Sequence, residues 1–564
     1  AVKVEIPDAW ADAVDAPAAE IEATPFVKEI VLPMDRQQGD RLPVSVFQKH
    51  GVLDGTWENG TSAYSKRGVA TMVPKWDGSK CAQCNRCVAT CPHAAIRPVL
   101  LTEEEKAGVP ASFHTVPARG LGKGAPSYSY RIQVSPYDCL GCGVCLKACP
   151  VEDALTMTPF EEMKEEQVSF DQVAMDERYL KKDVINSKNM KSIQFAKPYF
   201  QFSAACAGCA ETTYIKLVSQ LVGERMYIGN AAGCSSAYSG GAPILPYCKD
   251  NRGFGPAWEH SLFEDNAEFA FGFFHAQDAI RKELLIRMES LKAAGVAVEA
   301  IDNYVTNWAD KEKSRSVSDA LIAALEAAGK SEDRQYILDN KEYLSKKSVW
   351  AIGGDGWAYD IGFGGIDHVM SQNQDVNLLV LDTEVYSNTG GQSSKATPTA
   401  AVAKFASGGK HIAKKDLGAI LMNYGYVYVA QVAIGYDQAQ TLKAIREAEE
   451  YPGPSIIIAY CPCLEQHIKA GMSCTQTEMK KAVECGYWQL YRYDPRRITE
   501  GKNPFQLDSP EPDTSKLMDY MMGENRFASL KNNFPDRADA LYKKAIADIK
   551  ARYNKYRRMA DEQN

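Results

Sequence analysis

The sequence predicts an α/β protein with a doubly wound parallel sheet, joined to a small α+β domain rich in cysteine. Two observations support this fold class. Apolar runs as long as buried strands alternate with helical patterns in the C-terminal half, which is typical of a parallel sheet. Two copies of one spaced cysteine motif, CAQCNRCVATCP and CLGCGVCLKACP, occur in the N-terminal third and indicate an internally duplicated small domain.

Length and composition suit a chain of several domains. The protein has 564 residues, of which 45% are hydrophobic and 24% charged, an ordinary composition with material for about three or four domains. We expect an N-terminal linker and small mixed domain over residues 1–75. A cysteine-rich domain with a charged linker should follow over 76–195, and the α/β domain should occupy 196–564.

Charge and hydropathy exclude several classes of protein. The formal net charge of −8 argues against a nucleic-acid-binding surface. No apolar stretch reaches the roughly 18 residues of a membrane span. The acidic N-terminus lacks the pattern of a signal peptide, and the cysteine spacing suits metal ligands rather than disulfides. We therefore expect a cytoplasmic protein.

Four apolar runs predict the parallel strands of the α/β domain. VWAIGGDG (349–356) reads as a strand that enters a tight turn, followed by the helical pattern YDIGFGGIDHVMSQ. The runs at 376–384, 426–435 and 454–463 read as three further buried strands. The last forty residues carry Lys, Arg, Ala and Tyr at helical spacing, which predicts one or two surface helices.

The two N-terminal cysteine motifs each read C-x2-C-x2-C-x3-C-P, the spacing of bacterial proteins with two [4Fe-4S] clusters. In such paired motifs the fourth cysteine of each run binds the other cluster. Zinc binding or disulfides are a remote alternative. The predicted ligand sets are Cys81, Cys84, Cys87 and Cys149 for one cluster, and Cys139, Cys142, Cys145 and Cys91 for the other.

A third cysteine set is weaker when taken alone. Cys206 and Cys209 form a CxxC pair, and Cys234 follows in a Gly- and Ser-rich stretch. A zinc or redox site is the ordinary interpretation of a single CxxC pair, and a third cluster needs a fourth ligand. Its candidates are Cys248, Cys461, Cys463, Cys474 and Cys485.

A Gly-Asp-Gly turn predicts a Mg²⁺–diphosphate site. Gly354, Asp355 and Gly356 follow a strand and precede a helix, where an open α/β sheet binds ligands. Asp355 offers a hard oxygen to Mg²⁺. At the end of the next strand, the Thr383 hydroxyl, the Val385 carbonyl and the Asn388 amide could complete the site. An ordinary surface turn is the alternative, and the neighbouring third cysteine set makes it less favoured.

Taken together, these motifs closely resemble pyruvate:ferredoxin oxidoreductases, which are thiamine diphosphate enzymes. The resemblance includes KRGVATMVPKWD, the paired cysteine run with CPHAAIRP, ACAGCAETTY, GFGPAWEHSLFEDNAEFAFG, GGDGWAYDIGFGG and DTEVYSNTGGQSSKATP. It implies a thiamine diphosphate-binding fold for the α/β domain and a two-cluster ferredoxin-like fold for the smaller one. By the same resemblance, this chain is similar to the C-terminal half of the single-chain enzyme, or to a fusion of the small ferredoxin subunit with the thiamine-binding subunit.

The resemblance implies roles for individual residues. The cysteine of the family's late A-P-C segment falls on Cys463, which would complete a third, cofactor-proximal [4Fe-4S] cluster, although Cys461 stands where the family usually has another residue. Asn388 is expected near the thiamine and substrate, and Glu211 near the cofactor. The Mg²⁺ ligands would be Asp355, Thr383 and the Val385 carbonyl.

The implied activity is the oxidative decarboxylation of pyruvate with coenzyme A to acetyl-CoA and CO₂, which is reversible. Electrons would pass through the three clusters to ferredoxin or flavodoxin, in an anaerobic metabolism. The family's pyrimidine-binding and coenzyme A-binding domains have no counterpart in this sequence. A partner chain or a missing half is therefore expected to supply them, in an assembly that is a dimer of such units.

Two rival functions stay open on the sequence alone. A sister enzyme could act on 2-oxoglutarate, a branched-chain 2-oxoacid, indolepyruvate or oxalate, because the substrate groups lie mostly on the missing half. A non-catalytic polyferredoxin module for electron transfer would need the clusters alone. It would have no use for the Gly-Asp-Gly site.

Overall fold

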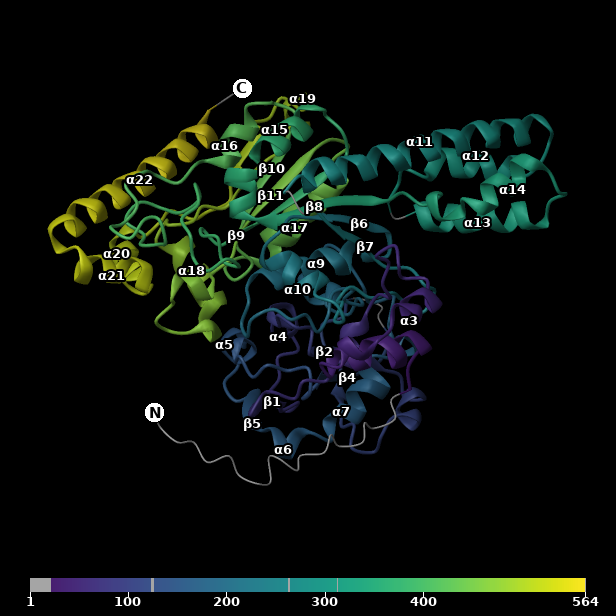
Figure 1. Ribbon diagram of the computed structural model, residues 1–564, viewed down its shortest axis with the longest axis horizontal. Helices are drawn as coiled ribbons and strands as arrows, with labels where there is room; N and C mark the ends of the chain where they lie inside the picture. The colour runs from purple at the N-terminus through teal and green to yellow at the C-terminus, as the bar shows by residue number, and fades with distance from the viewer. Residues whose placement is uncertain (1–21, 123–125, 262–263, 312, 563–564) are drawn as a thin grey trace.

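The computed structural model describes residues 22–122, 126–261, 264–311 and 313–562. It consists of a cysteine-rich lower part, a large α/β part and a helical arm that projects from the latter (Figure 1). Residues 1–21 of the predicted N-terminal linker and small mixed domain lie outside the described residues. No helix within the described ranges is long and apolar enough to cross a membrane.

The described N-terminal segment is helical where it is regular. It contains η1 (Val27–Val31), α2 (Leu32–Asp35) and α3 (Val44–Lys49) around a small core of its own. The segment is attached to the α/β part by hydrogen bonds, since the Ser62 hydroxyl donates to the Gln201 carbonyl at 2.9 Å. This segment thus packs against the large domain instead of linking freely to the next one.

The cysteine-rich part contains two small antiparallel sheets. Strand β1 (Met72–Trp76) pairs with β5 (Leu155–Pro159), so the two ends of this part of the chain lie side by side. Strands β2 (Ile96–Leu101), β3 (Val116–Pro117) and β4 (Ser129–Val134) form the other sheet in the order β2-β4-β3. Each cysteine motif continues into a short helix, α4 (Arg86–Thr90) or α5 (Val144–Ala148).

The charged stretch after β5 differs from the linker that we expected. It folds as α6 (Phe160–Met163), α7 (Glu166–Ser169) and η5 (Phe170–Ala174). Phe170 and Val173 are buried, and Glu166 accepts a 2.6 Å hydrogen bond from Arg131 on β4. Met163, Phe170 and Val173 thus give this charged sequence one buried apolar face.

The α/β part is built on an eight-stranded sheet in the order β13-β12-β10-β11-β9-β8-β6-β7. The six strands from β10 to β7 are parallel, whereas β12 and β13 form an antiparallel edge. The predicted fold class is confirmed, with this edge as an addition. The strand bounds are β6 Met226–Asn230, β7 Ala257–His260, β8 Ser348–Gly354, β9 Asn377–Asp382, β10 Tyr428–Val432, β11 Ser455–Tyr460, β12 Tyr491–Tyr493 and β13 Phe505–Leu507.

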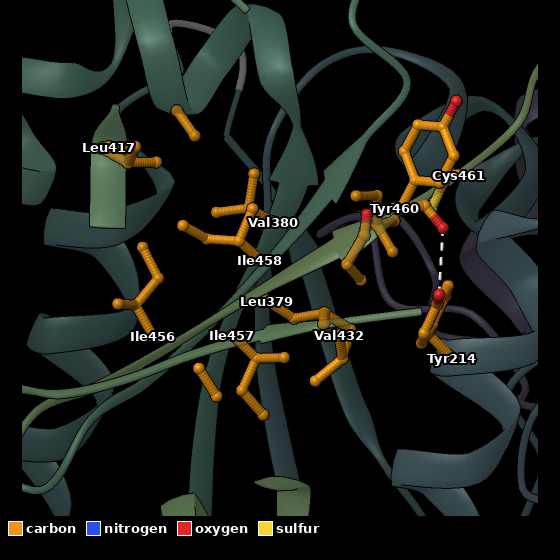
Figure 2. Close-up of a cluster of buried hydrophobic side chains, with 14 of the residues drawn as sticks. Tyr214, Leu379, Val380, Leu417, Val432, Ile456, Ile457, Ile458, Tyr460 and Cys461 are labelled. Carbon is orange, nitrogen blue, oxygen red and sulfur yellow. Dashed lines mark hydrogen bonds between the residues drawn. The ribbon is translucent and has the colours of Figure 1, made fainter. Parts of the chain in front are cut away.

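The four predicted strands form the centre of this sheet, where helices cover both faces and bury the side chains on either side. Figure 2 shows Leu379, Val380 and Ile456–Ile458 in the core between the strands and the covering helices. Full burial of each such side chain contributes about 1.5–3 kcal/mol. Tyr214 on α9 (Glu211–Val222) donates a 2.9 Å hydrogen bond to the Tyr460 carbonyl and so fixes this helix against the end of β11.

Two helical additions surround the sheet. The arm in Figure 1 comprises α11 (Asn266–Ala293), α12 (Val298–Asn307), α13 (Ser314–Ala327) and α14 (Glu332–Asp339). It has its own core, which includes Leu284, Leu321 and Leu325. The C-terminal residues form α20 (Leu517–Met522), α21 (Asn525–Asn533) and α22 (Pro535–Asp561). The remaining helices of the α/β part are α10 Cys234–Gly240, α15 Phe363–Ser371, α16 Leu417–Met422, α17 Gln438–Glu450, α18 Thr475–Glu484 and α19 Arg496–Thr499.

Candidate functional site

The two cysteine motifs of the small domain have the same backbone geometry. In the first motif Gln83 and Asn85 have φ of 54° and 59°, and in the second Gly141 and Gly143 have 64° and 75°. Because of this left-handed turn, the backbone N–H two residues after the first cysteine points at its sulfur, at 3.3 Å in the first motif and 3.4 Å in the second. Such N–H groups stabilise a reduced cluster.

The cysteines group across the two motifs. Burial raises the pKa of Cys87, and the neighbouring thiols of Cys84, Cys81 and Cys149 raise it further. In the same way, burial raises the pKa of Cys145, and among the neighbouring thiols Cys91 raises this pKa the most. Cys149 therefore lies with the first three cysteines of the other motif, and Cys91 with Cys139, Cys142 and Cys145. This crossed grouping matches the two predicted ligand sets.

The third cysteine set surrounds a cavity of about 180 Å³. Four thiols from three separate segments line it: Cys206 and Cys209 before α9, Cys234 at the start of α10 and Cys463 after β11. In the described part of the chain, no three His, Cys, Asp or Glu side chains converge closely enough to hold one metal ion. Four thiols spaced around a small cavity suit a cubane cluster better than a single zinc ion.

The other candidates for the fourth ligand do not line this cavity. Cys461 is fully buried and its thiol donates to the Ala459 carbonyl at 3.3 Å. Cys248 and Cys485 are also buried, with their thiols directed at backbone carbonyls. Cys474 is half-buried beside Ser473. The geometry thus favours Cys463.

The third set lies beside the second. The backbone N–H of Gly208, between Cys206 and Cys209, is hydrogen-bonded to the Cys142 thiol. Burial raises the pKa of this thiol to about 11, although the bonds from the Val144 and Gly208 N–H groups act to lower it. Gly208 has φ of +83°, and a Cβ there would lie 2.6 Å from the Met472 carbonyl oxygen. Glycine is therefore required where the two cysteine sets meet.

The predicted Mg²⁺ ligands converge at the ends of β8 and β9. The Thr383 hydroxyl lies 2.9 Å from both Asp355 Oδ1 and the Val385 carbonyl oxygen. Ser394, which the sequence reasoning missed, donates to Asp355 Oδ2 at 2.6 Å. Burial, followed by repulsion from Asp382, raises the pKa of Asp355 to about 7. Three oxygen donors at one point, one of them a buried carboxylate, fit a Mg²⁺ ion.

The two glycines of the Gly-Asp-Gly turn have different surroundings. A Cβ at Gly354 would meet nothing closer than 3.9 Å, whereas one at Gly356 would lie 2.3 Å from the ring of Tyr386. Tyr386 belongs to the loop after β9 and donates to the Gly356 carbonyl at 3.3 Å. Gly356 therefore allows the two loops of the site to pack together.

A buried charge network, also missed at the sequence level, holds the loop after β9. Glu384 has φ of +62° and is 1% exposed. Its carboxylate accepts hydrogen bonds from Lys414 at 3.0 Å and from Arg526 at 2.8 Å. Despite burial, these two cations and the Tyr487 hydroxyl lower the pKa of Glu384 to about 2. The network fixes a strained residue between Thr383 and Val385.

Glu211 and Asn388 line the same cavity as the third cysteine set, together with Thr383. Glu211 is buried at the start of α9, and burial raises its pKa to about 7. Tyr238 donates to its carboxylate at 3.0 Å. One cavity thus connects four thiols with the loop of the predicted Mg²⁺ site.

Three family models match the sequence. One describes a 4Fe-4S dicluster domain over residues 80–154, and one the C-terminal binding domain of thiamine pyrophosphate enzymes over 340–459. The third, over residues 13–70, is a domain of unknown function. The chain therefore contains an iron–sulfur domain and a thiamine diphosphate-binding domain, as predicted.

The chain is also similar to curated proteins over nearly its whole length. It is 48% identical to a pyruvate:ferredoxin oxidoreductase of Moorella thermoacetica, with 99% of this chain and 48% of that protein covered. It is 47% identical to a pyruvate-flavodoxin oxidoreductase of Klebsiella pneumoniae, with 100% and 48% covered. A mitochondrial NADP⁺ pyruvate dehydrogenase of Euglena gracilis is 44% identical, with 100% and 31% covered. The chain spans about half the length of the first two relatives.

Proposed function

We propose, from the homology of this chain to pyruvate:ferredoxin and pyruvate-flavodoxin oxidoreductases over nearly its full length, that it carries the electron-transfer and diphosphate-binding half of such an enzyme. The complete enzyme would convert pyruvate and coenzyme A to acetyl-CoA and CO₂, reversibly. The cavity shared by four thiols, Thr383 and Asn388 carries this proposal, because a cluster bound by these thiols would lie next to the proposed cofactor site.

The residues of the sheet edge would bind the cofactor. Asp355, the Thr383 hydroxyl and the Val385 carbonyl would hold Mg²⁺, and Gly354 would leave space for the diphosphate. Bound thiamine diphosphate would supply a carbanion for attack on the 2-oxo carbon and an electron sink for the loss of CO₂. Asn388 would face the reacting end of the cofactor.

The three cysteine sets would form an ordered path for electrons. Cys206, Cys209, Cys234 and Cys463 would hold the cluster nearest the cofactor. The hydrogen bond between the Gly208 N–H and the Cys142 thiol supports the set that contains Cys142 as the next cluster on the path. The set with Cys81 would come last and would transfer electrons to ferredoxin or flavodoxin.

Further polypeptide would be needed to complete the active site. Phe405 and Ile412, in the loops that follow β9, are 94% and 73% exposed, and Leu464 beside the cysteine cavity is 52% exposed. The exposure of these large apolar side chains near the proposed cofactor site supports the view that another domain covers this surface. That domain would supply the pyrimidine-binding and coenzyme A-binding parts, in a dimer of such units. We also propose a cytoplasmic, anaerobic setting.

An anaerobic bleaching experiment tests this function. The complete oxidoreductase is mixed with Mg²⁺, thiamine diphosphate, coenzyme A and pyruvate, and the iron–sulfur absorbance is followed. We expect bleaching that requires pyruvate. The Asp355→Asn variant should lose this pyruvate-dependent bleaching, although dithionite should still bleach its clusters. Bleaching by 2-oxoglutarate in place of pyruvate would instead identify a sister enzyme. A cluster-loaded protein that no 2-oxoacid reduces would be a module for electron transfer only.

A further inference from the structure

One buried side chain connects the proposed Mg²⁺ loop to the proposed ligand of the proximal cluster. Gln466 is 0% exposed and lies in the short helix η10 (Leu464–Gln466). Its Nε2 donates to the Thr383 carbonyl at 2.8 Å, and its Oε1 accepts from the Cys463 N–H at 3.2 Å. These two partners fix the orientation of the amide, because a carbonyl can only accept and an N–H can only donate.

The contact with Cys463 extends to its sulfur. The backbone N–H of Gln466 donates to the Cys463 carbonyl at 3.1 Å, and the Gln466 side-chain amide accepts from the Cys463 N–H, which closes a tight turn after this cysteine. Within this turn, the Glu465 N–H is hydrogen-bonded to the Cys463 thiol. Donors of this kind stabilise the reduced form of a cluster. Gln466 therefore maintains the turn that directs the Glu465 N–H at this sulfur.

The contact with Thr383 sets the position of the other loop. The Thr383 hydroxyl faces Asp355 and Val385 on one side of the backbone, and its carbonyl is bonded to Gln466 on the other. The adjacent Glu384 is strained and buried. If Gln466 were lost, the carbonyl of Thr383 would become a buried acceptor without this partner, which is unfavourable.

We propose that Gln466 is a positioning residue that couples the cofactor site to the proximal cluster. It keeps Cys463 at a fixed separation from Thr383, so that binding of Mg²⁺–thiamine diphosphate is transmitted to the electronic state of the cluster. This role rests on the proposed function, since it requires both groups in one site. A cubane accepts one electron at a time, and a fixed separation from the donor keeps that transfer reproducible.

Two substitutions separate the two bonds. Gln466→Met keeps the length of the side chain and removes both. Gln466→Glu can still accept from the Cys463 N–H, but its carboxylate cannot donate to the Thr383 carbonyl. Gln440 provides the matched control, because it is a buried glutamine of the same domain that bonds the Gln431 carbonyl and Asp508, away from the site.

The complete iron-loaded oxidoreductase is titrated with Mg²⁺–thiamine diphosphate, and its affinity and the EPR spectrum and potential of the proximal cluster are measured. We expect both Gln466 variants to lose about tenfold or more in affinity, which corresponds to the loss of one buried hydrogen bond. Gln466→Met should also change the proximal EPR spectrum, whereas Gln466→Glu should preserve it in the absence of cofactor. Gln440→Met should change neither.

The outcomes distinguish this role from the proposed function. A wild-type enzyme without a third cluster or without cofactor binding would contradict the proposed function itself. A wild type with both, but with Gln466 variants whose affinity stays within twofold and whose proximal spectrum is unchanged, would overturn the role of Gln466. Equal losses in Gln466→Met and Gln440→Met would also overturn it, because a general packing defect would then be the cause.

Discussion

Removal of Cys463 should eliminate one iron–sulfur cluster and leave the other two. The structure places twelve cysteines in three sets of four, and each set should hold four irons, about 12 per chain. Cys463→Ala removes one of four thiols from the 180 Å³ cavity. The iron content should therefore fall by about one third, to roughly 8 per chain.

The matched control is Cys461→Ala, two residues earlier. That thiol is fully buried and donates to the Ala459 carbonyl, so its removal should cost about 1 kcal/mol of stability and no iron. Iron analysis and EPR of the anaerobically reconstituted, dithionite-reduced protein give the two readouts. About 12 irons in Cys463→Ala, or a loss of four in Cys461→Ala, would refute this assignment.

Three further predictions concern other parts of the molecule. Lys216 is buried and donates to the Cys91 carbonyl at 2.9 Å. Because Lys216→Met removes a positive charge beside the clusters, it should make their reduction potentials more negative by tens of millivolts in a redox titration. An effect no larger than that of Lys147→Met, at an exposed lysine, would contradict this prediction. Glu384→Gly should retain more Mg²⁺–thiamine diphosphate affinity than Glu384→Ala, since glycine adopts φ of +62° without the roughly 1–2 kcal/mol that alanine pays; equal affinities would show that backbone strain is irrelevant. Leu321→Ala should destabilise the arm by about 2–5 kcal/mol, seen as faster hydrogen exchange in α11–α14 at constant iron content, and a loss of iron would show that the arm is not independent.

The centre of the fold could be predicted because its sequence has one interpretation. Ile456, Ile457 and Ile458 are buried in succession, and such a run fits a strand covered on both faces. Strands β6 and β7 were not predicted, because both are short and β7 alternates between exposed and half-buried residues. The arm was not predicted either. Its charged helices bury only a narrow stripe against each other, so the apolar signal is weak.

The site could be predicted as far as motifs carry ligands at fixed spacing. The crossed cysteine sets and the convergence of Asp355 with Thr383 follow from local patterns placed at neighbouring strand ends. The residues that hold these ligands in position cannot be predicted from local patterns. Arg526 reaches Glu384 across 142 residues of sequence, and Gln466 is a single glutamine between a glutamate and a histidine. Only the folded chain shows which partners such residues have.

The C-terminal helices therefore have a part in the site although they contribute no predicted ligand. Arg526, at the start of α21, bonds Glu384 and also Glu524 at 2.7 Å, and all three side chains are buried. Burial of these charges is costly unless each is paired. Separation of α21 from the sheet would remove the Arg526 cation from Glu384, which would keep only Lys414. Arg526 thus acts with Lys414 and Tyr487 to hold Glu384 in its left-handed conformation. Through this pair the C-terminal helices contact the loop of the predicted diphosphate site directly.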